Sequence, residues 1–170
     1  MRRVGIITTL SMSLLALTAS VALAAITTTI NPANAPSGTH LQSGAIGCTV
    51  GGDLSVTCSA FELAGVGNTN ANVSLTANYS ATIDCTNHGG NLVESHTSNF
   101  SDSSSATVTS RKNGRMAVPG QSASAFDAPQ VCPNPNWTPS IRPGTLTLNS
   151  FTYTLTFAGF AEAYITITGP

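Results

Sequence analysis

Few side chains in this sequence combine the type and spacing that catalysis requires. Asp84, His88 and His96 lie close together in the sequence and could in principle bind a metal ion or support a serine nucleophile. No GxSxG or HExxH motif accompanies them, so we expect both histidines to be solvated loop residues. The glutamates lack the local context of a glycosidase acid pair and are scattered over the chain: Glu62, Glu94 and Glu162. The sequence therefore predicts no enzyme, no metal site and no cofactor.

The four cysteines predict two disulfides: Cys48, Cys58, Cys85 and Cys132. Gly51-Gly52-Asp53 has the composition of a hairpin turn, and a three-residue loop at 52–54 would place Cys48 opposite Cys58. Cys85 would then pair with Cys132. An inter-sheet bridge from Cys85 to Cys48 or Cys58, as in immunoglobulin domains, stays open. No CxxC pair is present, which argues against a zinc site.

The segment Cys132–Pro139 is the most distinctive of the chain. Its prolines fix the backbone without regular structure, and it presents the only tryptophan, Trp137, beside Asn134 and Asn136. Such a rigid loop suits ligand binding or protease inhibition. The simpler interpretation is a loop that folds back to cover the core, because a lone aromatic beside prolines usually packs.

A second candidate surface is basic. Arg111, Lys112 and Arg115 surround Asn113-Gly114 and could bind an anionic cell-wall polymer, although a solvated hairpin tip is the commoner explanation. Threonines at alternate positions suggest an ice-binding ladder, but no repeat of fixed period supports it.

The N-terminus predicts secretion. Arg2 and Arg3 precede an uncharged run over 4–23, and Ala22-Leu23-Ala24 fits a signal peptidase site. Removal of residues 1–24 would leave 146 residues with four basic and seven acidic side chains, a net charge of −3. We expect an extracellular or loosely envelope-associated chain, since nothing after the signal suggests a span, lipid anchor or sorting tail.

The composition limits the classes of partner. Charged residues are only 8% of the chain, and the weakly acidic balance excludes the electrostatic footprint of a nucleic-acid or anionic-lipid binder. Low charge also weakens the repulsion between copies. We therefore expect a cell-wall polymer, an extracellular protein or the chain itself as partner.

Period-two alternation identifies the main strands. Apolar residues alternate with hydroxyl or amide residues over 73–85 and 151–157, as in half-buried strands. Shorter strands are expected at 46–50, 54–58 and 165–167, with an edge strand at 26–30. The apolar alternation changes phase at Asn149-Ser150, which favours a β-bulge over a tight turn at this point.

The remaining segments predict loops and one further hairpin. The Ser-rich run 95–105 suggests a mobile loop, 108–118 a hairpin around Asn113-Gly114, and 121–143 an irregular segment. No helical stripe occurs after the signal. We expect an all-β chain, an antiparallel β-sandwich of immunoglobulin-like or jelly-roll-like type, with an extended lead-in at 25–43 and one domain at 44–170.

Two segments carry a resemblance. The run Ser150–Phe160 and the Cys132–Pro139 segment resemble small exported proteins of high-GC Gram-positive bacteria, over most of the mature chain. This resemblance implies an extracellular or envelope location and no particular activity. Together with the residue patterns, it predicts a non-catalytic secreted or surface-associated domain with a structural or binding role. The alternatives are a secreted protease inhibitor using Cys132–Pro139 and a hydrolase whose site is assembled from distant loops.

Overall fold

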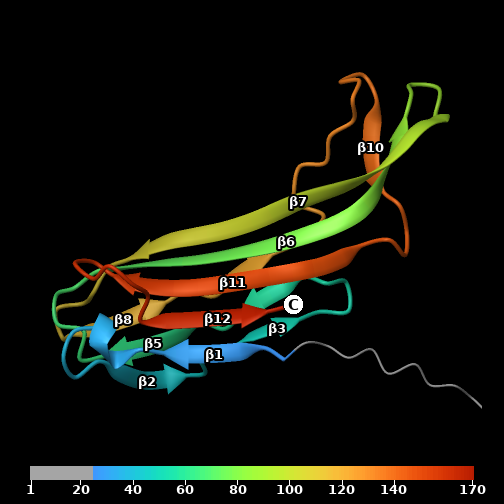
Figure 1. The fold of residues 1–170 in the computed structure, drawn as a ribbon. Helices are drawn as coiled ribbons and strands as arrows, with labels where there is room; N and C mark the ends of the chain where they lie inside the picture. Colours follow the sequence, from blue (N-terminus) through green and yellow to red (C-terminus); the bar gives the residue numbers. More distant parts are fainter. Residues whose placement is uncertain (1–24) are drawn as a thin grey trace, which may run out of the picture.

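The computed structural model describes residues 25–170, and its regular secondary structure consists almost entirely of β-strands (Figure 1). The predicted signal, residues 1–24, lies outside the described residues. The elements are β1 (Thr27–Ile30), the 3-10 turn η1 (Pro32–Asn34), β2 (His40–Gly44), β3 (Cys48–Val50), β4 (Val56–Cys58), β5 (Phe61–Ala64), β6 (Ala71–Thr86), β7 (Leu92–Val108), β8 (Arg115–Val118), β9 (Gln121–Ala123), β10 (Thr138–Ile141), β11 (Thr147–Phe157) and β12 (Ile165–Gly169).

One antiparallel sheet forms the first layer of the molecule. Its order is β1-β12-β11-β6, and β7 pairs with the other side of β6 along nearly its whole length. Beyond the first residue of β11, β10 takes its place beside the last residues of β6. The alternation of β6 buries its apolar side chains and leaves its hydroxyl and amide side chains on the outer face.

Two three-stranded sheets form the second layer, in the orders β2-β5-β8 and β3-β4-β9. One core joins both layers: Leu75, Tyr153 and Ile167 from the first sheet pack in the same cluster as Leu63 and Met116 from the second layer. Each of these five residues is at most 1% exposed. The predicted antiparallel β-sandwich with two disulfides is therefore confirmed.

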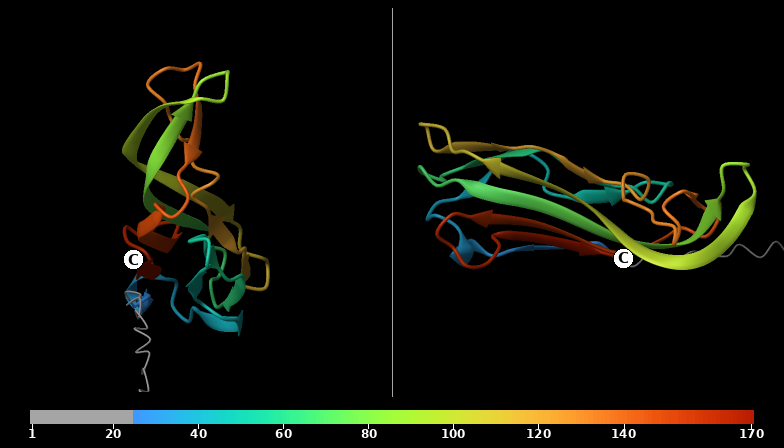
Figure 2. Two further views of the ribbon diagram at one scale, coloured as in Figure 1. Left: turned by 90° about the vertical axis from the view of Figure 1, so that its right-hand side faces the viewer. Right: turned by 90° about the horizontal axis from the view of Figure 1, so that it is seen from above.

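The β6–β7 hairpin extends beyond the sandwich as an arm, which we define as residues 81–98 together with 131–141. Figure 2 shows this hairpin curving away from the sandwich with the orange segment beside it. The arm has a small core of its own, in which Ala81, Ile83 and Cys85 are buried and Trp137 and Ile141 pack against them. The 16-residue strand β6 thus contributes the side chains of its first half to the main core and those of its second half to the arm core.

The disulfides follow the pairing that the expected hairpin allows, which was one of the alternatives left open by the sequence. Cys48 lies opposite Cys58 in the β3–β4 hairpin, and the two are bridged. The Gly51 amide donates to the Ser55 carbonyl, which closes the expected three-residue loop. Cys85 of β6 is bridged to Cys132, so the inter-sheet alternative does not occur.

The prediction of a mobile loop at 95–105 is wrong. These residues belong to β7, which pairs with β6 in register from Ala71↔Val108 to Cys85↔Glu94. Serine has little strand propensity of its own, but strand preference depends on the partner strand. The long, strongly alternating β6 supplies that partner.

The predicted hairpin over 108–118 is also wrong. A tight turn does form, with the Gly114 amide bonded to the Arg111 carbonyl and Gly114 at a φ of 70°. However, β8 pairs with β5 in the second layer and not with β7. The Gly114 carbonyl accepts from the Val66 amide, so the turn packs against a neighbouring loop and carries the chain between the layers.

The predictions for the chain ends and the late strands have mixed outcomes. The register shift between Leu148 and Ser150 confirms the bulge, and β12 confirms the final strand. The segment 121–143 is mostly irregular but contains β9 and β10. The expected lead-in, 25–43, supplies β1 and most of β2, which pair with β12 and β5.

Candidate functional site

Among the side chains considered for catalysis, His96 and Glu94 come close within residues 25–170, with His96 Nδ1 3.9 Å from Glu94 Oε1, whereas Asp84, His88 and His96 do not converge. Asp84 pairs in register with Ser95, whereas His96 pairs with Ile83, so Asp84 and His96 lie on opposite faces of the β6–β7 ribbon. His88 is exposed in the hairpin turn at the end of the arm. Within residues 25–170, no three His, Cys, Asp or Glu side chains are grouped as metal ligands would be.

Asp84 instead forms a structural ion pair. Arg142 donates from Nε to Asp84 Oδ2 at 3.1 Å and from Nη2 to Asp84 Oδ1 at 2.7 Å. The Ser95 hydroxyl donates to Asp84 Oδ1 at 2.6 Å and accepts from Arg142 Nη2 at 2.8 Å. Hydrogen bonds from Arg142, and then from Ser95, hold the pKa of Asp84 below its usual value. This bidentate pair fastens the β10–β11 connection to the arm.

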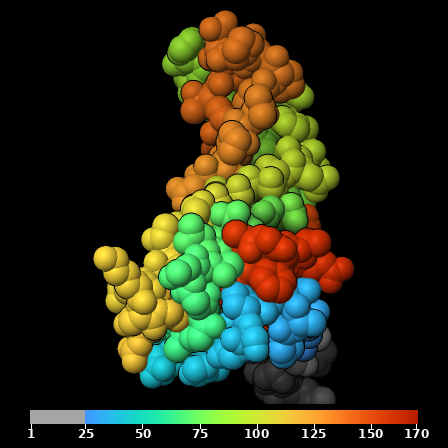
Figure 3. All heavy atoms as spheres, turned by 90° about the vertical axis from the view of Figure 1, so that its left-hand side faces the viewer, coloured from blue at the N-terminus to red at the C-terminus, as the bar shows by residue number. Residues whose placement is uncertain are grey.

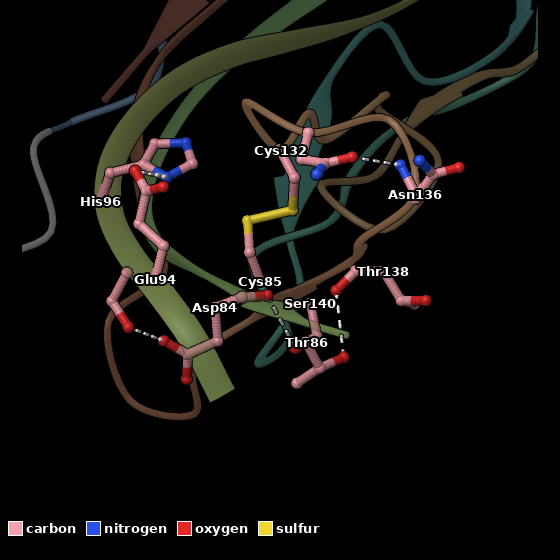
Figure 4. Close-up of a disulfide and its surroundings, with 11 residues drawn as sticks. Asp84, Cys85, Thr86, Glu94, His96, Cys132, Asn136, Thr138 and Ser140 are labelled. Carbon is pink, nitrogen blue, oxygen red and sulfur yellow. Dashed lines mark hydrogen bonds and ion pairs between the residues drawn. A yellow bond between two sulfur atoms is a disulfide. The ribbon is translucent and has the colours of Figure 1, made fainter. Parts of the chain in front are cut away.

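The Cys85–Cys132 disulfide fixes the rigid loop to the arm (Figure 4). Trp137 is partly buried and packs against the arm core. The loop closes on itself, because the Asn136 amide donates to Asn134 Oδ1 at 2.9 Å and the Trp137 amide to the Asn134 carbonyl at 3.0 Å. Trp137 thus covers the arm core, and Asn136 is exposed beside it; a binding role for this loop stays a prediction.

The basic turn, residues 111–115, lies at the opposite end of the molecule. Arg111 and Lys112 are exposed, whereas Arg115 lies 3.6 Å from the Glu62 carboxylate. Figure 3 shows this yellow segment projecting from the body. Because Trp137 lies beyond the far end of β6, about 50 Å of strand separates the two predicted surfaces, so they cannot form one site.

The outer face of the first sheet is polar and uncharged over the sandwich. Register pairing brings hydroxyl residues of five strands into one row: Thr29, Thr166, Thr154, Ser74 and Ser105. Sequence periodicity could not predict this row, because it arises from strand pairing. Twist between neighbouring strands, about 20° each, rotates such rows out of one plane.

A groove at the junction of the sandwich and the arm was not predicted from the sequence. We define the junction groove by its lining residues: Gly52, Asp53, Leu54, Phe126, Ile141, Arg142, Pro143, Gly144 and Leu146. Its volume is about 410 Å³. Three segments far apart in the sequence build it, namely the β3–β4 turn, the segment after β9, and the β10–β11 connection.

Phe126 is the one aromatic residue that lines the groove. It is 65% exposed, although large aromatic side chains usually bury most of their surface. Its turn is braced, since the Phe126 amide donates to Ser124 Oγ and the Gln130 side-chain amide donates to the carbonyls of Ala125 and Ala128. The hydrogen-bonded turn thus exposes an aromatic side chain to solvent, as is often seen at interaction sites.

Leu54 also lines the groove and lies in an unusual backbone conformation. Its φ is 64°, in the left-handed region that costs a side-chain-bearing residue about 1 kcal/mol or more. Leu54 also packs against the main core. A strained residue beside an exposed aromatic is the kind of feature that clusters at functional sites.

Two charged residues line the groove, the acidic Asp53 and the basic Arg142. Asp53 accepts from the Ser55 hydroxyl and amide, and these bonds lower its pKa, so it is ionised at neutral pH. Asp127 is exposed directly after Phe126. Arg142 is neutralised by Asp84. The groove therefore suits an apolar group that carries positive charge.

The comparisons with known proteins give no family. No protein-family model, curated protein or solved structure matches the chain. Function must therefore be argued from the site itself. Across residues 25–170, no helix is long and apolar enough to cross a membrane.

Proposed function

We propose that the mature chain is a non-catalytic extracellular domain that binds a partner in the junction groove. The observation that carries this proposal is the braced, exposed Phe126, which lines one groove together with the apolar side chains of Leu54, Ile141 and Leu146. Apolar and aromatic concavities with a few charged groups are the usual form of binding sites. The acid, imidazole and hydroxyl groups of the arm are engaged in structure or lie apart, which leaves recognition as the better interpretation.

An extracellular location is part of the same proposal. All four cysteines are paired, as expected of a chain that folds in an oxidising compartment. The signal pattern of residues 1–24 would deliver it there. Non-covalent contacts through the groove would then hold a fraction of the secreted chain at the cell envelope.

The test compares wild type with Phe126→Ser in cells that express the full chain. We expect wild type to divide between medium and envelope, and F126S to move largely into the medium. Val131→Ser is the matched control, because Val131 is 71% exposed on the same segment but does not line the groove.

Equal envelope retention of wild type and F126S would contradict the proposal. Turnover of a hydrolase substrate by the purified protein, lost on replacing groove residues, would contradict its non-catalytic part.

A further inference from the structure

The positive charge of the molecule is concentrated at one end. The described residues contain four basic side chains, of which Arg115 pairs with Glu62 and Arg142 with Asp84. Arg111 and Lys112 make no ion pair within residues 25–170 and lie next to each other on the projecting basic turn. The turn is rigid enough to present them, because the Arg111 amide donates to the Arg115 carbonyl at 2.7 Å.

The junction groove carries the complementary charge. Asp53 lines it and Asp127 follows its aromatic wall, and neither makes a salt bridge within residues 25–170. Within residues 25–170 the Asp53 carboxylate bonds only to Ser55 of its own turn, so no basic side chain there neutralises its charge. Arginine and lysine stems pack on apolar surfaces, and their cationic groups are attracted to aromatic faces such as that of Phe126.

The two features lie on different ends of the sandwich. The basic turn follows the end of β7 opposite the start of β6, whereas the groove lies where β11 begins, about 30 Å farther along the sheet. The turn of one molecule therefore cannot enter its own groove, but it can enter the groove of another.

We propose that the junction groove receives the basic turn of a second copy of this chain, so that copies associate head to tail. This inference rests on the binding site of the proposed function and adds a second copy of the chain as a partner of that site, besides the partner at the envelope. Arg111 and Lys112 of one copy pair with Asp53 and Asp127 of the next, and their stems lie against Phe126 and Leu54. The contact is heterologous, because it joins two different surfaces, the turn of one copy and the groove of the next. Each contact leaves the groove of the first copy and the turn of the second free, so further copies can add to form linear chains.

The test uses protein purified from the medium of cells that express the full chain, and sedimentation velocity at low ionic strength. Wild type forms species whose size grows with concentration and which dissociate as salt screens the charges. R111Q/K112Q lacks the turn charges and D53N/D127N lacks the groove charges, and each alone stays monomeric. The D53N substitution keeps a side-chain oxygen for Ser55 to contact, which preserves the β3–β4 turn.

A mixture of the two variants is the decisive sample. It contains one intact groove and one intact turn, so it forms a 1:1 dimer that cannot extend. S101D/S103D changes the net charge as much as R111Q/K112Q, but on the exposed outer face of β7, and assembles like wild type.

The proposal is overturned if wild type stays monomeric at low salt, if either variant associates alone, or if the mixture yields no dimer. Salt-resistant assembly would also exclude it. A monomeric wild type whose envelope retention still depends on Phe126 would leave the proposed function standing with a different partner.

Discussion

Removal of the Cys85–Cys132 disulfide, which links the two segments of the arm, tests whether the arm unfolds together with the sandwich. The bridge spans a sequence separation of 47, and the closed loop contains β7, β8 and β9. In the chain-entropy model, closing a loop of this length raises the free energy of unfolding by about 4 kcal/mol. The Cys48–Cys58 bridge, with a separation of 10, contributes about 3 kcal/mol on the same basis.

The expected result is a larger loss for C85A/C132A than for C48A/C58A. A loss of about 4 kcal/mol lowers the melting temperature by roughly 8–16 °C for a chain of this size. Urea unfolding gives two independent readouts, because Trp137 is the only tryptophan and lies in the arm, whereas circular dichroism follows all strands. Both transitions should move together, since the closed loop includes strands of the main core.

Two results would refute this reasoning. One is the reverse order of the two variants. The other is a Trp137 transition that moves while the circular dichroism transition stays in place, since that would show an arm that unfolds independently of the sandwich.

Three further predictions concern single side chains. The Tyr153 hydroxyl is buried and has no hydrogen-bond partner within residues 25–170, whereas the Tyr79 hydroxyl donates to the Ala123 carbonyl. Y153F should therefore leave the free energy of unfolding unchanged or raise it by up to about 1 kcal/mol, while Y79F should lower it by about 1 kcal/mol. Equal losses of stability in urea unfolding would contradict this prediction. The folded-state pKa of Asp84 is depressed, so its pair with Arg142 stabilises the folded state above the unfolded pKa near 3.8, and this stabilisation is lost as pH falls through the folded pKa. Wild type should therefore lose its higher free energy of unfolding relative to D84N on acidification. A difference in free energy of unfolding that stays constant with pH would exclude that role. A Cβ at Gly169 would overlap the buried Phe151 ring, so G169A should lower the free energy of unfolding by about 1–3 kcal/mol. G47A is the control and should lower it less, because a Cβ at Gly47 meets no atom within 4 Å.

The strands of the sandwich could be predicted where one face alternates strictly. Val73 to Cys85 and Phe151 to Phe157 bury every second side chain, as their pattern requires. The Gly51-Gly52-Asp53 turn also placed Cys48 opposite Cys58, because a loop of known length sets the register. In both cases the residue types within one segment were sufficient to predict the strand or the register.

The arm and the groove depend on contacts between distant segments. The serines of β7 form a strand because β6 lies beside them, and nothing within 95–105 signals that partner. Phe126 stands in a segment without periodicity, and its role is visible only once Leu54 and Leu146 lie beside it. The positive φ of Leu54 likewise depends on the hairpin and not on its residue type.

Hydrogen–deuterium exchange of dilute protein, with and without an isolated envelope preparation, tests the central claim most directly. High salt suppresses contacts between copies and leaves apolar contacts in place. We predict protection confined to the three groove segments, 52–54, 124–130 and 141–146. Protection at Cys132–Trp137 or on the outer face of β6 and β7, with none in the groove, would show that the domain binds elsewhere and contradict the account.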